Sequence, residues 1–267
     1  MVHQPSKVVV ITGSTRGIGF GLAREFLTRY CRVVVSGRTQ ESTQEAVARL
    51  TEHAEADQIL GQPCDVRCYD QVTALWDAAI DRFGRVDIWI NNAGIGTDQR
   101  DLWTHDPDEM AAVVETNVLG TLYGCRVAIA GMLAAGTGEI YNMEGLGSDG
   151  RRVEGLTLYG TSKRAIRYLT RGLVEEAKGT PVIVGTLSPG MVTTDLLLSP
   201  YDRDSEDWER AKRIFDILAD RVDTVTPWLV GQILTANRHG VRHRWLTFPK
   251  LLWRFVTAPF RHRHVVD

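Results

Sequence analysis

Short apolar runs alternate along the sequence with longer stretches of helical spacing, and this alternation constrains the fold more than any other feature. The apolar runs are rich in β-branched residues and span 7–12, 31–37, 86–92, 138–143 and 181–188. Apolar residues recur at helical spacing over 17–30, 40–54, 68–83, 107–135 and 158–178. Because the short runs are continuously apolar, we expect strands that are buried on both faces. The pattern predicts βαβ units and therefore an α/β fold, a doubly wound parallel sheet with helices on both faces.

No proline-rich or serine-rich linker interrupts this alternation, so we expect a single domain over residues 1–267. Two segments depart from the rest in composition. Residues 195–223 are acidic with an apolar helical stripe, which is typical of a lid over a substrate. Residues 238–267 form a basic and aromatic C-terminal extension, in which 238–264 hold seven Lys and Arg and no Asp or Glu. Contact with a membrane surface, packing on the body of the protein and a subunit interface all stay open for this extension.

Composition excludes several classes of function. A net charge of −2 gives no reason to expect a nucleic-acid partner. The four cysteines have neither metal-ligand spacing nor a disulfide framework, so we expect no metal site and reduced thiols in the cytoplasm. The sequence shows no signal peptide and no run of 18 apolar residues. Peripheral contact through the C-terminal extension is the only membrane association that this composition favours.

A glycine-rich stretch, VVVITGSTRGIGFGLAREF, follows the first predicted strand. Gly13, Gly17 and Gly19 fall between that strand and an apolar-striped helix. Glycines at this position let the backbone approach a pyrophosphate, whose charge then lies at the helix N-terminus. The stretch predicts a nucleotide site in a Rossmann-like domain, with a tight structural turn as the alternative.

Charge indicates which nicotinamide cofactor this site prefers. Enzymes that prefer NAD usually carry an Asp or Glu at the end of the second strand, for the ribose 2′-hydroxyl. Here that strand ends in Ser36-Gly37-Arg38, and Arg16 lies in the glycine loop. Two guanidinium groups can bind a 2′-phosphate through charge-assisted hydrogen bonds, although either arginine alone could be a solvated surface residue. The pair predicts NADPH/NADP⁺ as the cofactor.

Four motifs in order resemble the short-chain dehydrogenase/reductase family over residues 7 to about 195. They are Thr12-Gly13-x3-Gly17-x-Gly19, Asn91-Asn92-Ala93-Gly94, Asn117 and Tyr159-x3-Lys163. Within that family, YNMEGLGSDG, YGTSKRAI and LSPGMVTTDLLL are similar to the chlorophyll b reductases. Family members often form homo-oligomers, so the resemblance also implies a homo-oligomer.

Tyr159 and Lys163 lie four residues apart in a helical pattern, so their side chains share one face. A neighbouring ammonium favours the phenolate of a tyrosine, whose pKa is otherwise about 10. The resemblance implies that Tyr159 donates a proton to a carbonyl oxygen, that Lys163 also holds the nicotinamide ribose, and that Asn117 anchors a proton-relay water. An exposed helix pair is the alternative for Tyr159 and Lys163, and a helix-bending polar residue for Asn117.

The same resemblance implies a set of cofactor contacts along the chain. Asp65 corresponds to an adenine-contacting residue, with a helix N-cap as its alternative role. The complete set is Gly13, Ser14, Thr15, Arg16, Gly17, Ile18, Gly19, Arg38, Asp65, Val66, Asn92, Ala93, Gly94, Tyr159, Lys163, Pro189, Gly190, Val192 and Thr194.

One position departs from the family pattern. The family's catalytic serine, which donates a hydrogen bond to the substrate oxygen, should fall near Gly145, and the sequence has Glu144-Gly145 there. Ser148 could supply a hydroxyl instead, and so could Glu144 if burial kept it protonated. Gly145 could also leave room for a wide, flat substrate. A glycine-rich loop without a catalytic role is the remaining alternative.

These observations predict an NADPH-dependent oxidoreductase that reduces a bulky hydrophobic aldehyde or ketone to an alcohol. The chlorophyll b reductase resemblance implies a formyl-tetrapyrrole, whose 7-formyl group becomes hydroxymethyl. A carbonyl reductase for another bulky substrate is one alternative, and an NADP-binding sensor or scaffold with little turnover is another.

Overall fold

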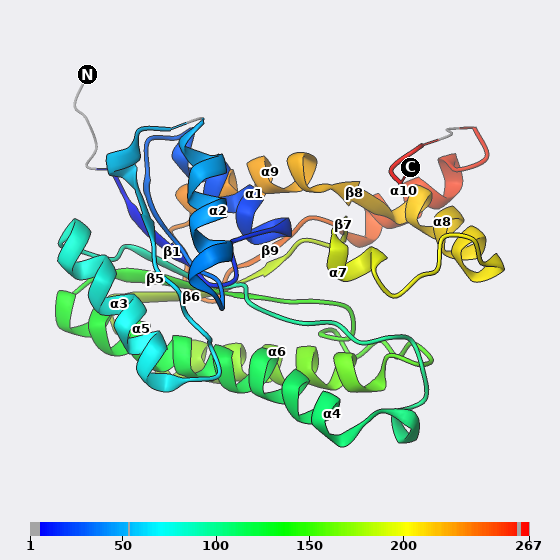
Figure 1. Cartoon of the computed structure of the whole chain (residues 1–267), viewed down its shortest axis with the longest axis horizontal. Helices are drawn as coiled ribbons and strands as arrows, with labels where there is room; N and C mark the ends of the chain where they lie inside the picture. The colour runs from blue at the N-terminus through cyan, green and yellow to red at the C-terminus, as the bar shows by residue number, and fades with distance from the viewer. Residues whose placement is uncertain (1–5, 53, 261–262, 267) are drawn as a thin grey trace.

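The computed structural model describes residues 6–52, 54–260 and 263–266, and its centre is a seven-stranded parallel sheet (Figure 1). The strand order is β3-β2-β1-β4-β5-β6-β9. The strands are β1 (Val8–Ile11), β2 (Arg32–Val35), β3 (Ile59–Gly61), β4 (Ile88–Asn91), β5 (Gly138–Met143), β6 (Val182–Ser188) and β9 (Arg242–Arg244). The chain winds outward from β1 in one direction to β3 and in the other to β9. This topology confirms the predicted doubly wound, Rossmann-like fold.

Helices cover both faces of the sheet, and alternate side chains of each strand pack into two separate hydrophobic cores. In β1, Val9 and Ile11 belong to the core under α1, α2 and α9, whereas Val8 and Val10 belong to the core under α3, α5 and α6. All four side chains are at most 1% exposed, which explains why the run is continuously apolar. The helices are α1 (Gly17–Leu27), α2 (Gln40–Thr51), α3 (Tyr69–Phe83), α5 (Gly120–Ala135), α6 (Thr157–Glu176) and α9 (Val222–Leu234).

A continuous helical stretch crosses one face of the sheet. It begins as α4 (Pro107–Val113), passes through a π-helical turn (Val114–Leu119) and continues as α5. By length and composition alone, Pro107–Ala135 could cross a membrane. Cys125, Ala128 and Met132 of α5 are nevertheless buried against the sheet, so this stretch serves here as a core helix. The π-helical turn carries Asn117, and such turns are frequent at functional sites.

The strands β3 and β9 were not anticipated from the sequence. β3 is only three residues long, Ile-Leu-Gly, and pairs through Val33↔Ile59 at one edge of the sheet. β9 reads Arg-His-Arg at the other edge and pairs with β6 through Leu187↔His243. Neither strand has the long apolar run that signals burial on both faces, because an edge strand has only one neighbour.

The second half of the chain adds a lobe beside the sheet (Figure 1). It contains α7 (Asp195–Leu198), α8 (Glu206–Leu218), α10 (Phe248–Thr257) and a two-stranded parallel sheet of β7 (Met191–Thr193) and β8 (Ala219–Arg221). Trp208 and Phe215 of α8 form a small core of their own with Ala219. The lobe therefore has a hydrophobic centre separate from the two layers that flank the main sheet.

Candidate active site

The glycine-rich loop between β1 and α1 packs too closely for larger residues. Gly13 has φ +61°, a left-handed conformation that favours glycine. A Cβ on Gly19 would lie 2.5 Å from both the Gly13 carbonyl oxygen and the Asn92 side-chain nitrogen. The loop therefore keeps its backbone exposed at the N-terminus of α1, where a pyrophosphate would bind.

Thr12 and Asn92 tie this loop to the carboxyl end of β4. The Thr12 hydroxyl oxygen accepts hydrogen bonds from the backbone N–H groups of Asn92 and Ala93, each at 3.0 Å. The Asn92 side-chain amide donates to the carbonyl oxygens of Thr12 and Gly13, each at 2.9 Å. These bonds join the ends of adjacent strands at the topological switch point, where doubly wound sheets bind ligands.

Ser14 supports the loop from beneath. Its hydroxyl donates to the Ile11 carbonyl oxygen at 2.7 Å and accepts from the Ser36 backbone N–H at 2.9 Å. The residue is fully buried. Its hydroxyl is therefore bonded within the protein, and the predicted cofactor contact of Ser14 stays a prediction.

The two arginines predicted to bind a 2′-phosphate each follow a residue of the same contact, which joins the glycine-rich loop to the end of β2. Thr15 lies against Gly37, because a Cβ on that glycine would come within 2.4 Å of the Thr15 methyl group. Arg16 and Arg38 follow these two residues in the chain, and both are exposed. The Arg16 guanidinium lies 3.6 Å from the Asp195 carboxylate, and both side chains are about three-quarters exposed, so water screens this pair.

Asp65 lies at the same edge, next to these arginines. Its carboxylate accepts hydrogen bonds from the Arg67 backbone N–H and guanidinium, between 2.7 and 3.1 Å. The Arg67 guanidinium is the main cause that lowers the pKa of Asp65, and Arg38 adds a smaller effect. The N-cap of α3 is Cys68, so the alternative role of Asp65 as that cap is wrong.

Tyr159 and Lys163 share one face of α6, as the spacing predicted. The Lys163 ammonium lies 5.7 Å from the centroid of the Tyr159 ring, and Lys163 is only 5% exposed. Burial raises the pKa of Tyr159 to about 12 and lowers that of Lys163 to about 8. The tyrosine shift is opposite to the one expected from the lysine charge, because desolvation of the phenolate dominates here. A high pKa keeps the phenol protonated near neutral pH, as a proton donor requires.

Asn117 connects three elements beneath this pair. Its side-chain oxygen accepts from the Ile95 backbone N–H at 2.8 Å, and its side-chain nitrogen donates to the Ile95 carbonyl oxygen and the Ser162 hydroxyl, each at 3.0 Å. Ser162 in turn donates to the Tyr159 carbonyl oxygen at 2.7 Å. A Cβ on Gly94 would lie 3.1 Å from the Asn117 oxygen and 3.4 Å from the Lys163 ammonium. Asn117, Gly94 and Lys163 are therefore neighbours.

Gly145 faces the Tyr159 hydroxyl, at the position where the family serine was expected. A Cβ there would lie 2.5 Å from the Tyr159 oxygen and 3.1 Å from Lys163 Cγ. Ser148 does not take over the missing donor in this structure. Its hydroxyl donates to the Gly145 carbonyl oxygen at 2.7 Å and accepts from the Gly145 N–H at 3.0 Å, so it closes the loop on itself.

The Glu144 carboxylate has arginine partners near the edge of the sheet that β9 forms. Its side chain accepts hydrogen bonds at 2.9 and 2.6 Å from the guanidinium of Arg242 on β9, and Arg167 of α6 lies 3.9 Å away. Glu144 is 3% exposed. The Glu144 carboxylate therefore already has a guanidinium partner on β9, and it points to the sheet edge through that contact.

The segment after β6 closes over the glycine loop. A Cβ on Gly17 would meet the Thr194 methyl group at 3.4 Å, and one on Gly96 would meet Leu196 at 3.4 Å. Thr194 and the start of α7 therefore lie over both loops. Pro189 and Gly190 form the turn between β6 and β7. The other predicted contacts, Ile18, Val66 and Val192, are wholly or partly buried in the flanking cores.

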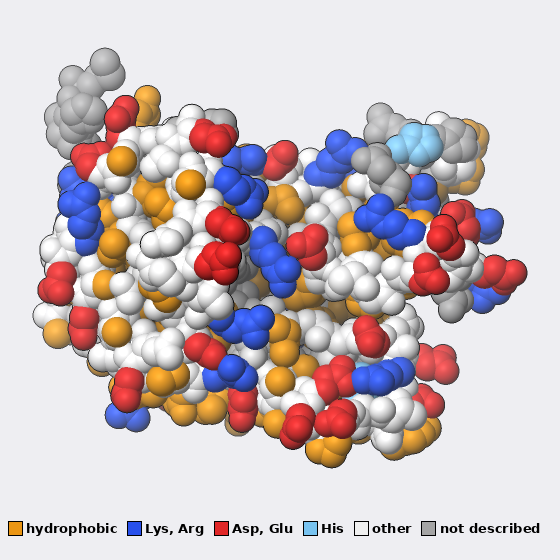
Figure 2. All heavy atoms as spheres, in the orientation of Figure 1, with side chains coloured by type: hydrophobic (Ala, Val, Ile, Leu, Met, Phe, Trp, Pro, Cys, Tyr) orange, Lys and Arg blue, Asp and Glu red, His pale blue; other side chains and the backbone are white. Residues whose placement is uncertain are grey.

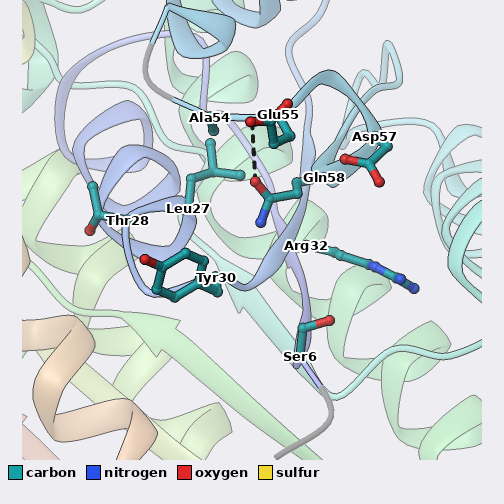
Figure 3. A pocket seen from close by; sticks show the side chains of 9 residues that line it. All are labelled: Ser6, Leu27, Thr28, Tyr30, Arg32, Ala54, Glu55, Asp57 and Gln58. Carbon is teal, nitrogen blue, oxygen red and sulfur yellow. Dashed lines mark hydrogen bonds between the residues drawn. The ribbon is translucent and has the colours of Figure 1, made fainter. Parts of the chain in front are cut away.

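A cavity of about 600 Å³ lies elsewhere, at the amino ends of β1 and β2 (Figure 3). Leu27, Tyr30, Arg32 and Gln58 are among its lining residues, and the Glu55 backbone N–H donates to the Gln58 side chain there. Doubly wound sheets bind their ligands at the carboxyl ends of the strands. This cavity is therefore separate from the candidate site around Tyr159.

Comparison with known proteins identifies the family. The family model described as short chain dehydrogenase matches residues 7–204. The chain belongs to the short-chain dehydrogenase family. As a member it is an oxidoreductase that uses a nicotinamide cofactor, and the glycine-rich loop and the Tyr159–Lys163 pair lie in the matched region.

Plant chlorophyll b reductases are among the relatives of this dehydrogenase. Chlorophyll(ide) b reductase NOL from Oryza sativa subsp. japonica is 40% identical over 86% of this chain and 67% of its own length. Probable chlorophyll(ide) b reductase NYC1 from the same plant is 35% identical over 97% of this chain and 53% of its own length. The dehydrogenase thus spans about half the length of one relative and about two thirds of the other.

Solved structures agree with the fold. A single-residue variant of actinorhodin polyketide ketoreductase with NADPH superposes with a TM-score of 0.80 at 29% identity, over 92% of this chain and 97% of that chain. Levodione reductase superposes with a TM-score of 0.82 at 23% identity, over 91% and 97%.

Thr12, Ser162 and Arg242 complete the site without having been predicted as site residues. Thr12 and Ser162 lie inside two of the quoted motifs, Thr12-Gly13-x3-Gly17-x-Gly19 and Tyr159-x3-Lys163, and that position was the available signal. Arg242 had no local signal, because its partner Glu144 lies 98 residues earlier in the chain.

Proposed function

We propose that this dehydrogenase uses NADPH to reduce the aldehyde of a bulky hydrophobic substrate, and that a formyl-tetrapyrrole of the chlorophyll b type is that substrate. The observation that carries the proposal is Gly145, whose missing Cβ lets the Tyr159 hydroxyl lie directly against the loop backbone where the family serine was expected. The similarity to chlorophyll(ide) b reductases over most of the chain supports the substrate class. Both plant relatives are named as chloroplastic proteins. The cytoplasmic location expected from the sequence stays a proposal for this dehydrogenase.

The glycine-rich loop fits a dinucleotide. Its left-handed Gly13 and close-packed Gly19 leave backbone N–H groups at the N-terminus of α1 for a pyrophosphate. Arg16 and Arg38 would hold the 2′-phosphate, because both are exposed and no carboxylate occupies the end of β2. Bound there, the nicotinamide supplies a hydride for the carbonyl carbon.

The residues of α6 and its neighbours would handle the proton. Tyr159 would donate its phenolic proton to the carbonyl oxygen, because its raised pKa keeps the proton in place until charge develops on that oxygen. The Lys163 ammonium would stabilise the resulting phenolate and hold the nicotinamide ribose. Asn117 would position Lys163 and the loop around Gly94, and through them a relay water.

The lid prediction for 195–223 fits this arrangement. Thr194 and Leu196 reach over the loops around Gly17 and Gly96, and α7 and α8 follow them. We propose that α7 and α8 cover a substrate bound beside Tyr159. The proposed substrate is apolar, and the exposed Leu196 would give it an apolar contact.

NADPH oxidation with a panel of aldehydes tests the proposal. The panel contains a formyl-tetrapyrrole, the matched tetrapyrrole without its formyl group, and small aliphatic and aromatic aldehydes. We expect turnover of the formyl-tetrapyrrole and none of its matched partner. Tyr159→Phe should lower the rate by about 100-fold or more, with NADPH affinity nearly unchanged.

Other outcomes of this panel would indicate a different substrate or a different function. Turnover of other bulky aldehydes or ketones but not of the tetrapyrrole would indicate a different carbonyl reductase. NADPH binding without turnover of any compound would favour a sensor or scaffold. Retention of more than about a tenth of the rate in Tyr159→Phe would remove Tyr159 as the proton donor.

A further inference from the structure

The helix α10 presents an apolar face to solvent. Phe248 is 67% exposed, and Leu252, Phe255 and Val256 are each about half or more exposed. Phe260, just beyond the helix, is 86% exposed. At helical spacing, Phe248, Leu252 and Phe255 lie along one stripe. Five large apolar side chains within thirteen residues exceed the scattered exposure that is normal for a monomeric surface.

The opposite face of α10 is anchored to the protein, so the orientation of the helix is determined. Arg254 is 7% exposed and donates to the Asp220 carboxylate at 2.9 and 2.6 Å and to the Leu218 carbonyl oxygen at 2.7 Å. Arg263 donates to the same carboxylate at 2.7 Å. Trp245 adds an indole N–H at 2.6 Å. The apolar stripe is exposed because this buried cluster holds the other side of the helix.

A basic pocket of about 380 Å³ lies between α8 and α10. Arg213, Lys250, Arg254, Arg263 and His264 line it, with Asp216 as the acidic member of the lining. Figure 2 shows basic and apolar side chains close together over this lobe, with acidic side chains beside them. Asp220 beneath the pocket already has two arginine partners. The pocket therefore keeps an excess of positive charge.

Lys250 is a partly buried member of this pocket. Its ammonium lies 3.0 Å from the centroid of the Trp245 ring. Burial is the main cause that lowers the pKa of Lys250 to about 8; Arg254 and Arg263 lower it further, and Asp220 opposes them. An anion entering the pocket would restore the favourable environment of this ammonium.

We propose that α10 and the pocket beside it form a docking surface for an anionic phospholipid bilayer. Phe248, Leu252 and Phe255 would enter the boundary between headgroups and acyl chains, and a lipid phosphate would occupy the α8–α10 pocket. A helix with an apolar aromatic face beside basic side chains is the pattern that lies in a membrane interface.

Charge favours a bilayer over a second copy of the chain. A two-fold contact would place this surface against itself. The α8–α10 pocket has Arg213, Lys250, Arg254 and Arg263 against Asp216 and Asp220, so such a contact would oppose net positive charge to net positive charge. An anionic lipid surface complements them instead.

The surface adjoins the proposed lid, because α10 packs on α8. Docking would bring α8 and the approach to Tyr159 close to the bilayer, where a hydrophobic aldehyde dissolves. This delivery role depends on the proposed function, whereas lipid binding itself does not.

Co-sedimentation with vesicles tests the docking surface without any substrate. We compare vesicles of phosphatidylcholine alone with vesicles of phosphatidylcholine and phosphatidylglycerol in equal parts. The full chain should bind the anionic vesicles, and added salt should weaken the binding. Leu252→Ser with Phe255→Ser should weaken it by at least about ten-fold, given the apolar surface that two such side chains bury. Arg213→Gln should weaken binding to the anionic vesicles selectively.

Tyr168→Ser is the matched control, because Tyr168 is 82% exposed on α6, outside this surface. It should bind vesicles like the unmodified chain. Both Tyr168→Ser and the Leu252 and Phe255 variant should oxidise NADPH with a soluble aldehyde at the unmodified rate. Failure of the unmodified chain to bind anionic vesicles would overturn the proposal, and so would full binding by the Leu252 and Phe255 variant.

Two further measurements would identify a partner other than a bilayer for the α10 surface and its pocket. Analytical ultracentrifugation that shows a dimer lost in the Leu252 and Phe255 variant, with no vesicle binding, would assign the surface to a second copy. Thermal stabilisation by inorganic phosphate, again with no vesicle binding, would assign the pocket to a soluble anion. Either result replaces the bilayer as the partner.

Discussion

Gly145 shows how one missing side chain shapes the site. The space that its Cβ would occupy lies 2.5 Å from the Tyr159 oxygen, closer than a real Cβ approaches any neighbour. A serine at this position would therefore do more than restore a hydrogen-bond donor, because its Cβ would also displace the phenol. The glycine therefore allows the phenol hydroxyl to lie against the loop at this distance.

Gly145→Ala tests this interpretation of the site. The new methyl group must push the Tyr159 hydroxyl aside, and a shift of about 1 Å in a reacting group can cost about 100-fold in rate. We expect kcat to fall about 100-fold for small and bulky aldehydes alike, with the Kd for NADPH nearly unchanged. Gly172→Ala is the control, on the same helix as Tyr159, because its Cβ would have no neighbour within 4 Å. Unaltered kcat in Gly145→Ala would show that Tyr159 adapts or does not act.

The proposed role of the two arginines at the cofactor edge is to bind the 2′-phosphate through charge-assisted hydrogen bonds. Arg16→Ala and Arg38→Ala should each weaken NADPH by about 1.5–3 kcal/mol, the contribution of a hydrogen bond to a charged group, and should affect NADH much less. Titration of both cofactors by fluorescence measures the difference. The exposed pair of Arg16 with Asp195 contributes little and should not compete strongly with a phosphate. Equal losses for the two cofactors would mean that neither residue binds the 2′-phosphate.

At the scale of elements, buried ion pairs join segments that are distant in sequence. Glu144 at the end of β5 binds Arg242 on β9, and Asp220 on β8 binds Arg254 on α10. Arg254 also donates to the Leu218 carbonyl oxygen at the C-terminus of α8, where unsatisfied carbonyl groups favour a cation. Part of the basic character of the C-terminal extension therefore serves internal packing, and part faces the α8–α10 pocket.

Asp220→Asn tests how strongly this cluster holds the C-terminal lobe. The change removes the carboxylate charge and leaves Arg254 buried without its counter-ion. Breaking a buried pair from one side typically costs about 3–5 kcal/mol, and we expect a loss of that size in the free energy of unfolding. Denaturant titration measures it. Asp223→Asn is the control, because its pair with Arg24 lies at the surface and should contribute less than about 1 kcal/mol. Equal effects of the two changes would contradict the anchoring role of Asp220.

At the scale of the whole molecule, the sheet and its layers were predictable and the edges were not. The five apolar runs became the strands β1, β2, β4, β5 and β6 because each is covered by helices on both faces. β3 and β9 are edge strands. Each forms by pairing with a neighbouring strand, and no pattern within its own residues signals that pairing. The helix α9 was missed although it packs directly on α1 across the first core.

Part of the candidate site was likewise predictable from the sequence, and part was not. The spacing of Tyr159 and Lys163 placed them on one helical face, and the glycine spacing placed a tight turn before α1. The pKa of Tyr159 was mispredicted in direction, because burial depends on everything packed around the phenol and not on the residue four positions away. Ser14 and Ser148 were predicted as site residues from their positions in the loops, and only the structure shows that both hydroxyls bond to the backbone of those loops.

The sequence by itself determined the order of the five central strands and the helices between them, the position of the glycine turn and the shared face of the Tyr159–Lys163 pair. These features depend on spacings of a few residues, which local backbone geometry converts directly into structure. Only the tertiary structure decided that Gly145 faces the Tyr159 hydroxyl, that Glu144 binds an arginine 98 residues away, and that Asp220 holds α10 with its apolar side outward. Each of these depends on which surfaces meet when the chain closes, and on the charge and burial that every neighbour then imposes on the group.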